Sequence, residues 1–164
     1  MILRPAVRND HDAILALNEE SVRFLSPMDQ ARLLALDAEA AWHHVVEREG
    51  EVLGFVLAFR EGANYDSINY RWFTERYAPF LYIDRVVVSG AAQGMGLGKL
   101  LYGGVFAYAK QHQLPWVTCE YDIDPPNPAS ERFHVGFGFT EVGRQAVANG
   151  KKWVSLQAAK IALP

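Results

Sequence analysis

The heptapeptide Gln93-Gly94-Met95-Gly96-Leu97-Gly98-Lys99 follows a strand-like run, residues 81–88, and opens a segment with the apolar spacing of a helix. Its three alternating glycines let the backbone turn sharply and leave the N–H groups uncovered. The helix that begins here adds the positive end of its dipole at the same place. The heptapeptide is therefore predicted to form an anion cradle, for a phosphate or a pyrophosphate.

Two common glycine-rich nucleotide loops do not fit this spacing. A P-loop needs a glycine where Gln93 stands and a Ser or Thr where Leu100 stands. The dinucleotide fingerprint needs a third glycine at Lys99 or at Leu101. The pattern that remains, Gln-x-x-Gly-x-Gly between a strand and a helix, resembles motif A of the GNAT superfamily of acyl-CoA-dependent N-acetyltransferases.

A second stretch strengthens this resemblance. Residues 127–139 read NPASERFHVGFGF, which is similar to the family's motif B, where an Asn precedes a short helix that bears Phe-Tyr and ends in Gly-Phe. The two stretches are separated by one predicted helix and one predicted strand, as in the family. The N-terminal half, which carries substrate selectivity in such enzymes, matches only in outline.

Composition limits the classes of protein. The chain has 164 residues, half of them hydrophobic and 21% charged, which suits one globular domain over residues 1–164. The formal charge of −3 gives no basic field for nucleic acid. No apolar run of about 18 residues and no signal-peptide pattern is present, so we expect no membrane partner and a cytoplasmic location. A single cysteine, Cys119, excludes an intramolecular disulfide.

The hydrophobic pattern predicts an α/β fold with a mixed, mainly antiparallel central sheet and helices on both faces, in the element order of GNAT proteins. The aromatic-rich connection over residues 60–79 is expected to be functional or to hold a short helix. Gly103-Gly104 inside a predicted helix indicates close backbone packing. Strands are expected at 2–7, 42–48, 52–59, 80–88, 116–122, 139–147 and 152–161, and helices from Asn9 or Asp10 to Leu25, from Asp29, at 97–111 and from Asn127.

The resemblance implies where acetyl-CoA sits. The strand through Val86 should separate from its neighbour over residues 117–121, with the pantetheine arm between them and the pyrophosphate on the glycine loop. Buried packing alone also explains the valines, and helix capping alone also explains Asn127 and Ser130. The expected cofactor-binding residues are Val86, Val87, Val88, Gln93, Gly94, Met95, Gly96, Leu97, Gly98, Lys99, Asn127, Ser130 and Phe133.

Acetyl transfer to an amine needs a base, an oxyanion donor and a proton for the departing thiolate. Asp84 is the leading base, because some polyamine acetyltransferases of the superfamily carry a carboxylate nine positions before the glycine motif. Strand alternation places it on one face with Tyr82, Val86 and Val88. An ordinary ion pair, for instance with Arg85, is the other reading of Asp84.

Glu120 on the neighbouring strand is the alternative base, and a solvated strand charge explains it equally well. His134 stands where the family most often has Tyr, and it is either the acid for the thiolate or a histidine that only packs there. The backbone N–H of Val87 or Val88 is the expected oxyanion donor. Cys119 is read as a buried strand residue rather than a nucleophile, since no base stands near it.

His43 and His44 should point to opposite faces of a strand, so we expect no metal site. The predicted function is N-acetylation of a small-molecule primary amine by direct transfer from acetyl-CoA in a ternary complex. A protein or peptide acetyltransferase and a non-catalytic acyl-CoA sensor are the alternatives, and a homodimer is possible because dimers are common in the family. The expected acceptor-binding residues are Asn18, Glu19, Tyr65, Tyr70 and Trp72.

Overall fold

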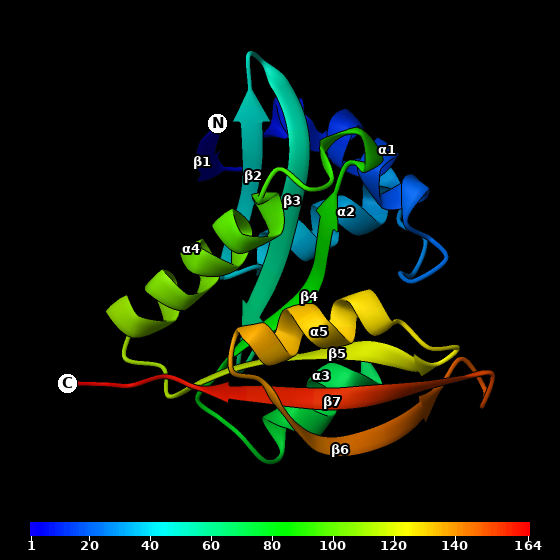
Figure 1. Ribbon diagram of the computed structural model, residues 1–164, viewed down its shortest axis with the longest axis vertical. Coiled ribbons are helices and arrows are strands. Elements are labelled where there is room, and N and C mark those ends of the chain that lie inside the picture. Colours follow the sequence, from blue (N-terminus) through cyan, green and yellow to red (C-terminus); the bar gives the residue numbers. More distant parts are fainter.

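A seven-stranded sheet runs through the protein, and the computed structural model describes all residues from Met1 to Pro164 (Figure 1). The strands lie in the order β1-β2-β3-β4-β5-β7-β6, and only β4 and β5 pair in parallel. The mixed, mainly antiparallel sheet of the sequence prediction is confirmed. The strands are β1 Ile2–Pro5, β2 Trp42–Arg48, β3 Glu51–Arg60, β4 Leu81–Val88, β5 Trp116–Asp124, β6 Thr140–Val147 and β7 Lys152–Lys160.

Helices cover both faces of this sheet (Figure 1). Apolar residues of α1, α2 and α3 form one buried cluster with one face, and α4 and α5 pack against a second cluster on the other face. The aromatic connection does hold a short helix, α3, as the sequence allowed. The helices are α1 His11–Glu20, α2 Gln30–Glu39, α3 Ile68–Thr74, α4 Leu97–Gln111 and α5 Pro128–Gly136, with 3-10 turns η1 Arg8–Asp10 and η2 Gly90–Ala92. None of them has the length and apolar character needed to span a bilayer.

Helix α1 ends at Glu20, five residues before the predicted end at Leu25. The apolar spacing continues past Glu20, but tertiary hydrogen bonds redirect the backbone. Buried Asn18 and buried Arg85 both donate to the carbonyl of Ser26, at 3.1 and 3.3 Å. The chain therefore turns beneath β4 before α2 begins. Asp29 caps α2 as predicted, accepting from the backbone N–H of Arg32 at 2.8 Å.

Strands β4 and β5 separate after a short parallel pairing. Leu81 pairs with Val117 and Tyr82 with Thr118, and no later residues pair. Because β4 continues to Val88 and β5 to Asp124, the two strands diverge into a gap, called the fork below. The predicted separation of these strands is confirmed.

A β-bulge at Asp84 changes which face the following residues occupy. The β3 pairing shifts between Leu57, opposite Arg85, and Ala58, opposite Ile83. Asp84 is the extra residue, so alternation along β4 is interrupted. Tyr82 belongs to the core under α1–α3, whereas Val86 and Val88 pack toward α4. The prediction that Asp84 shares a face with Tyr82, Val86 and Val88 is therefore wrong for the valines.

The two adjacent glycines of α4 differ in their surroundings. An added Cβ at Gly104 would lie 2.5 Å from the ring of Trp42 and 2.7 Å from Leu3, whereas one at Gly103 meets nothing within 4 Å. The close packing predicted for both glycines is confirmed for Gly104 alone.

This difference predicts opposite effects of two alanine substitutions. Gly103→Ala should raise the free energy of unfolding by about 1 kcal/mol through helix propensity. Gly104→Ala should lower it by roughly 1–2 kcal/mol, because overpacking against Trp42 exceeds the same propensity gain. Urea unfolding of both variants measures the signs, and a stabilised Gly104→Ala would contradict the packing.

Candidate active site

The glycine loop and the start of α4 form the predicted cradle. Gly94 and Gly96 both have φ of +80°, a conformation that favours glycine, and Gly96 is the N-cap of α4. The first N–H groups of an α-helix have no acceptor within the helix. These helix N–H groups remain available here. In the loop before them, the N–H of Met95 donates to the carbonyl of Ala92. This arrangement fits a pyrophosphate.

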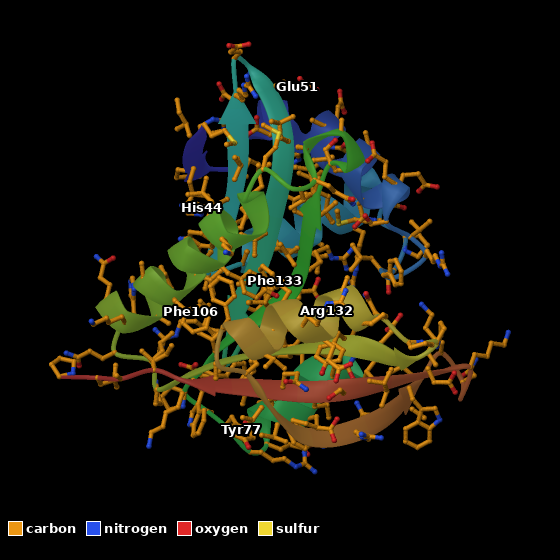
Figure 2. All side chains as sticks on the ribbon, in the orientation of Figure 1. His44, Glu51, Tyr77, Phe106, Arg132 and Phe133 are labelled. Atoms are coloured by element: carbon orange, nitrogen blue, oxygen red, sulfur yellow. The ribbon has the colours of Figure 1, made fainter.

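Helix α5 packs against the same end of α4. The ring of Phe133 lies against Gly98, and a Cβ added at Gly98 would be only 3.2 Å from that ring. Figure 2 shows Phe106 of α4 and Phe133 of α5 between the two helices. Asn127 caps α5, accepting from the N–H of Ser130 at 3.3 Å. The two helices thus form one wall beside the fork.

Glu120 lies at the fork on β5 and is hydrogen-bonded from β4. The hydroxyl of Tyr82 donates to both its carboxylate oxygens, at 2.9 and 2.7 Å. Burial raises the pKa of Glu120 to about 8, and the Asp84 charge adds to the rise, while hydrogen bonds from Tyr82 and Asn69 oppose it. Burial likewise raises the pKa of Tyr82 well above its usual value, so this phenol stays protonated and donates.

Asp84 is occupied by structural partners. Its Oδ2 lies 2.7 Å from the Nε of Arg85, and both side chains are only 5% exposed. Its other carboxylate oxygen accepts from the hydroxyl of Tyr65. Asp122 pairs with Lys152 at 3.4 Å. Of the three acids near the fork, Glu120 alone has no ion-pair partner.

His134 is 5% exposed and both ring nitrogens are engaged. Its Nδ1 lies 2.7 Å from the carbonyl of Ser130, which can only accept, so Nδ1 carries the proton. Its Nε2 lies 2.6 Å from the hydroxyl of Tyr102 and accepts from it. Burial lowers the pKa of His134, which favours the neutral ring.

Several residues of the site were not predicted from the sequence. Asn69 of α3 accepts from the side-chain amide of Gln145 at 2.9 Å, and it lies near enough to Glu120 to lower the pKa of that carboxyl. Tyr102, one turn after Gly98 on α4, reaches His134. The spacing of Tyr102 along α4 is a signal that could have found it. No sequence signal points to Asn69 and Gln145, because the two side chains meet only in the folded structure.

Of the five predicted acceptor residues, Tyr65 and Tyr70 pack together, with ring centroids 5.5 Å apart, and the other three lie apart from them. Asn18 is fully buried, and Tyr70 is 3% exposed with its hydroxyl on the carbonyl of Arg60. Trp72 packs against Gly143 and lies under the guanidinium of Arg76. Glu19 lies exposed on α1. Tyr65, through its bond to Asp84, and Tyr70, through its contact with the ring of Tyr82, lie beside the fork.

Two other predictions concern chemistry that the site could have used. Cys119 is buried, and burial raises the pKa of its thiol, as expected for a packed strand cysteine. His43 binds Asp37 of α2 on one face while His44 stacks on Trp42 on the other, so the opposed orientation is confirmed.

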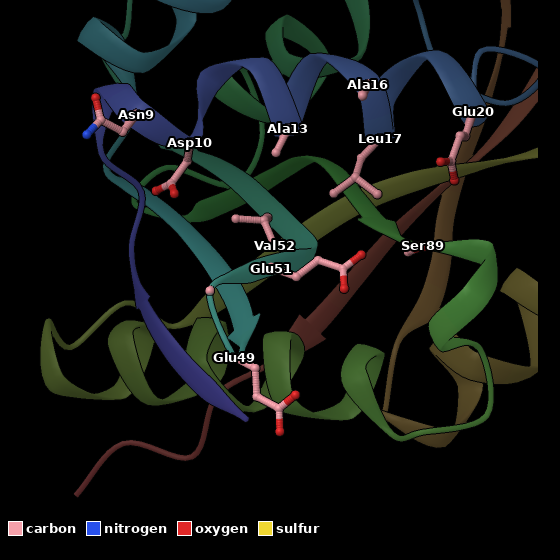
Figure 3. A pocket seen from close by; sticks show the side chains of 11 residues that line it. Asn9, Asp10, Ala13, Ala16, Leu17, Glu20, Glu49, Glu51, Val52 and Ser89 are labelled. Carbon is pink, nitrogen blue, oxygen red and sulfur yellow. The ribbon is translucent and has the colours of Figure 1, made fainter.

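A hollow of about 550 Å³ lies away from the fork, between α1 and the turn of the β2–β3 hairpin (Figure 3). Asp10, Glu20, Glu49 and Glu51 line it. Asp10 is already bound to Arg4 at 2.8 Å. None of the fork residues Tyr82, Asp84 and Glu120 lines the hollow, so it is separate from the fork.

Comparisons with known proteins agree with this architecture. A family model described as "Acetyltransferase (GNAT) family" matches residues 11–139. A relative from Pseudomonas phage PaMx11, named 5-NmdU N-acetyltransferase, is 26% identical over 161 residues, covering 93% of this chain and 99% of the relative. Among solved structures, Ard1 from Thermoplasma volcanium has a TM-score of 0.80 at 16% identity, covering 98% of this chain and 97% of its own. The structure of yncA, a putative acetyltransferase from Salmonella typhimurium with its cofactor acetyl-CoA, has a TM-score of 0.74 at 21% identity. The match covers 100% of this chain and 95% of the yncA chain.

Proposed function

The chain belongs to the GNAT acetyltransferase family and is an acyltransferase, and from this premise we propose that it transfers acetyl from acetyl-CoA directly to a primary amine. The observation that carries the proposal is the fork, where Glu120 stands without an ion-pair partner beside the separated edge of β4. The carboxylate of Glu120 is therefore free to accept a proton from an amine that attacks there. Direct transfer in a ternary complex needs no protein nucleophile, which agrees with the inert environment of Cys119.

Acetyl-CoA, as the donor substrate, would lie along α4 and enter the fork from the α4–α5 face. The N–H groups from Gly94 to Lys99, apart from that of Met95, would hold its pyrophosphate. The unpaired β4 edge around Val86 and Val88 would bond the amides of its pantetheine arm. Asn127, Ser130 and Phe133 would line the opposite wall, and the N–H of Val87 or Val88 would receive the oxyanion.

Glu120 is the proposed base in place of Asp84. The hydroxyl of Tyr82 donates to both oxygens of its carboxylate, so the group that receives the proton is fixed in position. Asp84 has both oxygens occupied by Arg85 and Tyr65. Its role is then to anchor the segment before α2 rather than to accept a proton.

The acceptor is proposed to be the primary amine of a small molecule that approaches from the α1–α3 face. A specific second candidate is 5-NmdU, because the phage relative named for it matches nearly the full length of this chain. The formal charge of −3 provides no broad basic surface for a long nucleic acid. The free compound is therefore the form of this second candidate that we favour.

Thiol release from acetyl-CoA tests the proposal with a panel of polyamines, amino acids, peptides, 5-NmdU and an oligonucleotide that contains it. Turnover with a small amine supports the proposal, and calorimetry separately reports acetyl-CoA binding. Turnover confined to peptides would instead make the chain a peptide acetyltransferase. Binding of acetyl-CoA with no turnover on any amine would leave a sensor function.

A further inference from the structure

Protonation of the departing thiolate lacks an evident donor on the α5 side of the fork. His134 already donates its only ring proton to the carbonyl of Ser130, and its second nitrogen accepts from Tyr102. Tyr102 is 1% exposed, and burial raises the pKa of its phenol well above the usual value. Loss of a proton from either ring would leave a buried, uncompensated anion.

The α1–α3 side of the fork offers one movable proton. The hydroxyls of Tyr65 and Tyr82 are committed to Asp84 and Glu120, and Asp84 is paired with Arg85. Glu120 alone changes its proton content during the proposed reaction, because it accepts one proton from the amine. After that step it is a carboxylic acid beside the separated strand edge.

We propose that Glu120 performs both proton transfers, first as the base for the attacking amine and then as the acid for the departing thiolate. Tyr102 and His134 are in this view positioning residues that hold α4 and α5 together. The proposal rests on the proposed acetyltransferase function and names the proton path through its site.

The atoms balance with this one carboxylate. The acceptor enters as a neutral amine after releasing one proton to solvent. Its nitrogen forms a bond to the carbonyl carbon, whose π electron pair moves to oxygen. Glu120 takes the proton from nitrogen, the carbonyl re-forms, and the C–S bond breaks with its electron pair on sulfur. Glu120 then gives its proton to sulfur and returns to carboxylate, so the products are amide and thiol.

The surroundings of Glu120 suit this double use. A pKa of about 8 lies close to that of an ordinary thiol, so a proton on Glu120 can move to a thiolate without a large energetic penalty. The hydrogen bonds from Tyr82 and Asn69 stabilise the carboxylate and thereby limit the rise. The titratable groups that influence Glu120 from its own side of the sheet are Tyr82 and Asp84 of β4, Asp122 of β5 and Tyr65 before α3. Cys119 and Tyr102, which belong to the cluster on the α4 side, are coupled to its charge more weakly.

The first test is the pH profile of kcat for the full chain and for the variant His134→Gln. Glutamine can still form hydrogen bonds at this position, but it cannot transfer a proton to a thiolate. Both should rise through about pH 8 and stay level to about pH 10, because no second group must remain protonated. His134→Gln and Tyr102→Phe should change kcat by less than about fivefold and act on the KM and calorimetric affinity for acetyl-CoA. A hundredfold fall in kcat of His134→Gln with acetyl-CoA still bound would overturn the proposal.

The second test separates the acid half from the base half. Glu120→Gln and the unmodified protein are compared with acetyl-CoA and with an acetyl ester of an acidic aryl thiol, whose thiolate leaves without a proton. The rate ratio between the two proteins should shrink by about tenfold or more with the aryl donor. An unchanged ratio would remove the acid role while leaving the base role intact. Absence of turnover by the unmodified protein would instead reject the acetyltransferase function itself.

Discussion

Glu120→Gln is expected to lower kcat by about a hundredfold or more, the usual effect of removing a general base or acid. The amide keeps the shape of the side chain but cannot accept a proton from the amine. Affinity for acetyl-CoA should stay nearly unchanged, because the residues that we propose to hold that substrate lie on the glycine loop and α4 and do not include Glu120. Steady-state kinetics with the best amine of the panel, together with calorimetry, measure both quantities.

The pH dependence of this variant has a defined sign. The carboxylate is the active form, so activity of the unmodified protein should rise as pH increases through the raised pKa of Glu120, about 8. Glu120→Gln should lose this rise. Asp122→Asn is the matched control, since Asp122 lies two residues along β5 and pairs with Lys152; it should keep the rise. A Glu120→Gln variant with unaltered kcat would exclude Glu120 from the chemistry.

The same raised pKa predicts a change in stability that does not depend on activity. Folded Glu120 holds its proton up to about pH 8, whereas the unfolded chain releases it near the ordinary value of 4.5. The folded protein therefore binds more protons between these values, and stability from this group decreases as pH rises through that window. Glu120→Gln should consequently become more stable relative to the unmodified protein at pH 9 than at pH 4.

Short-range patterns were sufficient to predict the backbone of the glycine loop and the start of α5. The alternating glycines before α4 and the Asn-Pro start of α5 are local signals, and their geometry depends on backbone preferences that glycine and proline carry wherever they occur. Gly94 and Gly96 adopt the positive φ that the cradle needs. The resemblance to a known family then predicted the order of the remaining elements.

The acceptor side depended on tertiary contacts that no local pattern records. The bulge at Asp84 appears only in the pairing of β4 with β3. The raised pKa of Glu120 needs the burial and the Asp84 charge that the folded sheet creates. The bond between Tyr102 and His134 joins residues 32 positions apart in the sequence. Sequence reasoning could therefore name Asp84, Glu120 and His134 as candidates, and it placed Asp84 before Glu120 without knowing the partners of either carboxylate.

Arg85→Met is expected to lower the free energy of unfolding by about 3–5 kcal/mol, the usual result of removing one member of a buried ion pair. The Asp84–Arg85 pair is 5% exposed on both sides. Methionine fills much of the volume but leaves the Asp84 carboxylate with only the hydroxyl of Tyr65. The guanidinium bonds to Asn18 at 3.1 Å and to the carbonyl of Ser26 at 3.3 Å would also be lost.

Two further variants test whether the loss of stability comes from the unpaired Asp84 charge. The double variant Asp84→Asn/Arg85→Met should be clearly more stable than the sum of the two single variants implies, because it leaves no buried charge without a partner. Arg32→Met is the control, since its pair with Asp66 is 41% and 72% exposed and should contribute less than about 1 kcal/mol. Urea unfolding of the four proteins measures the coupling, and hydrogen exchange over residues 21–29 should rise in Arg85→Met alone. Additive effects of the two single substitutions would show that Asp84 does not depend on Arg85, and would return Asp84 to consideration as the base.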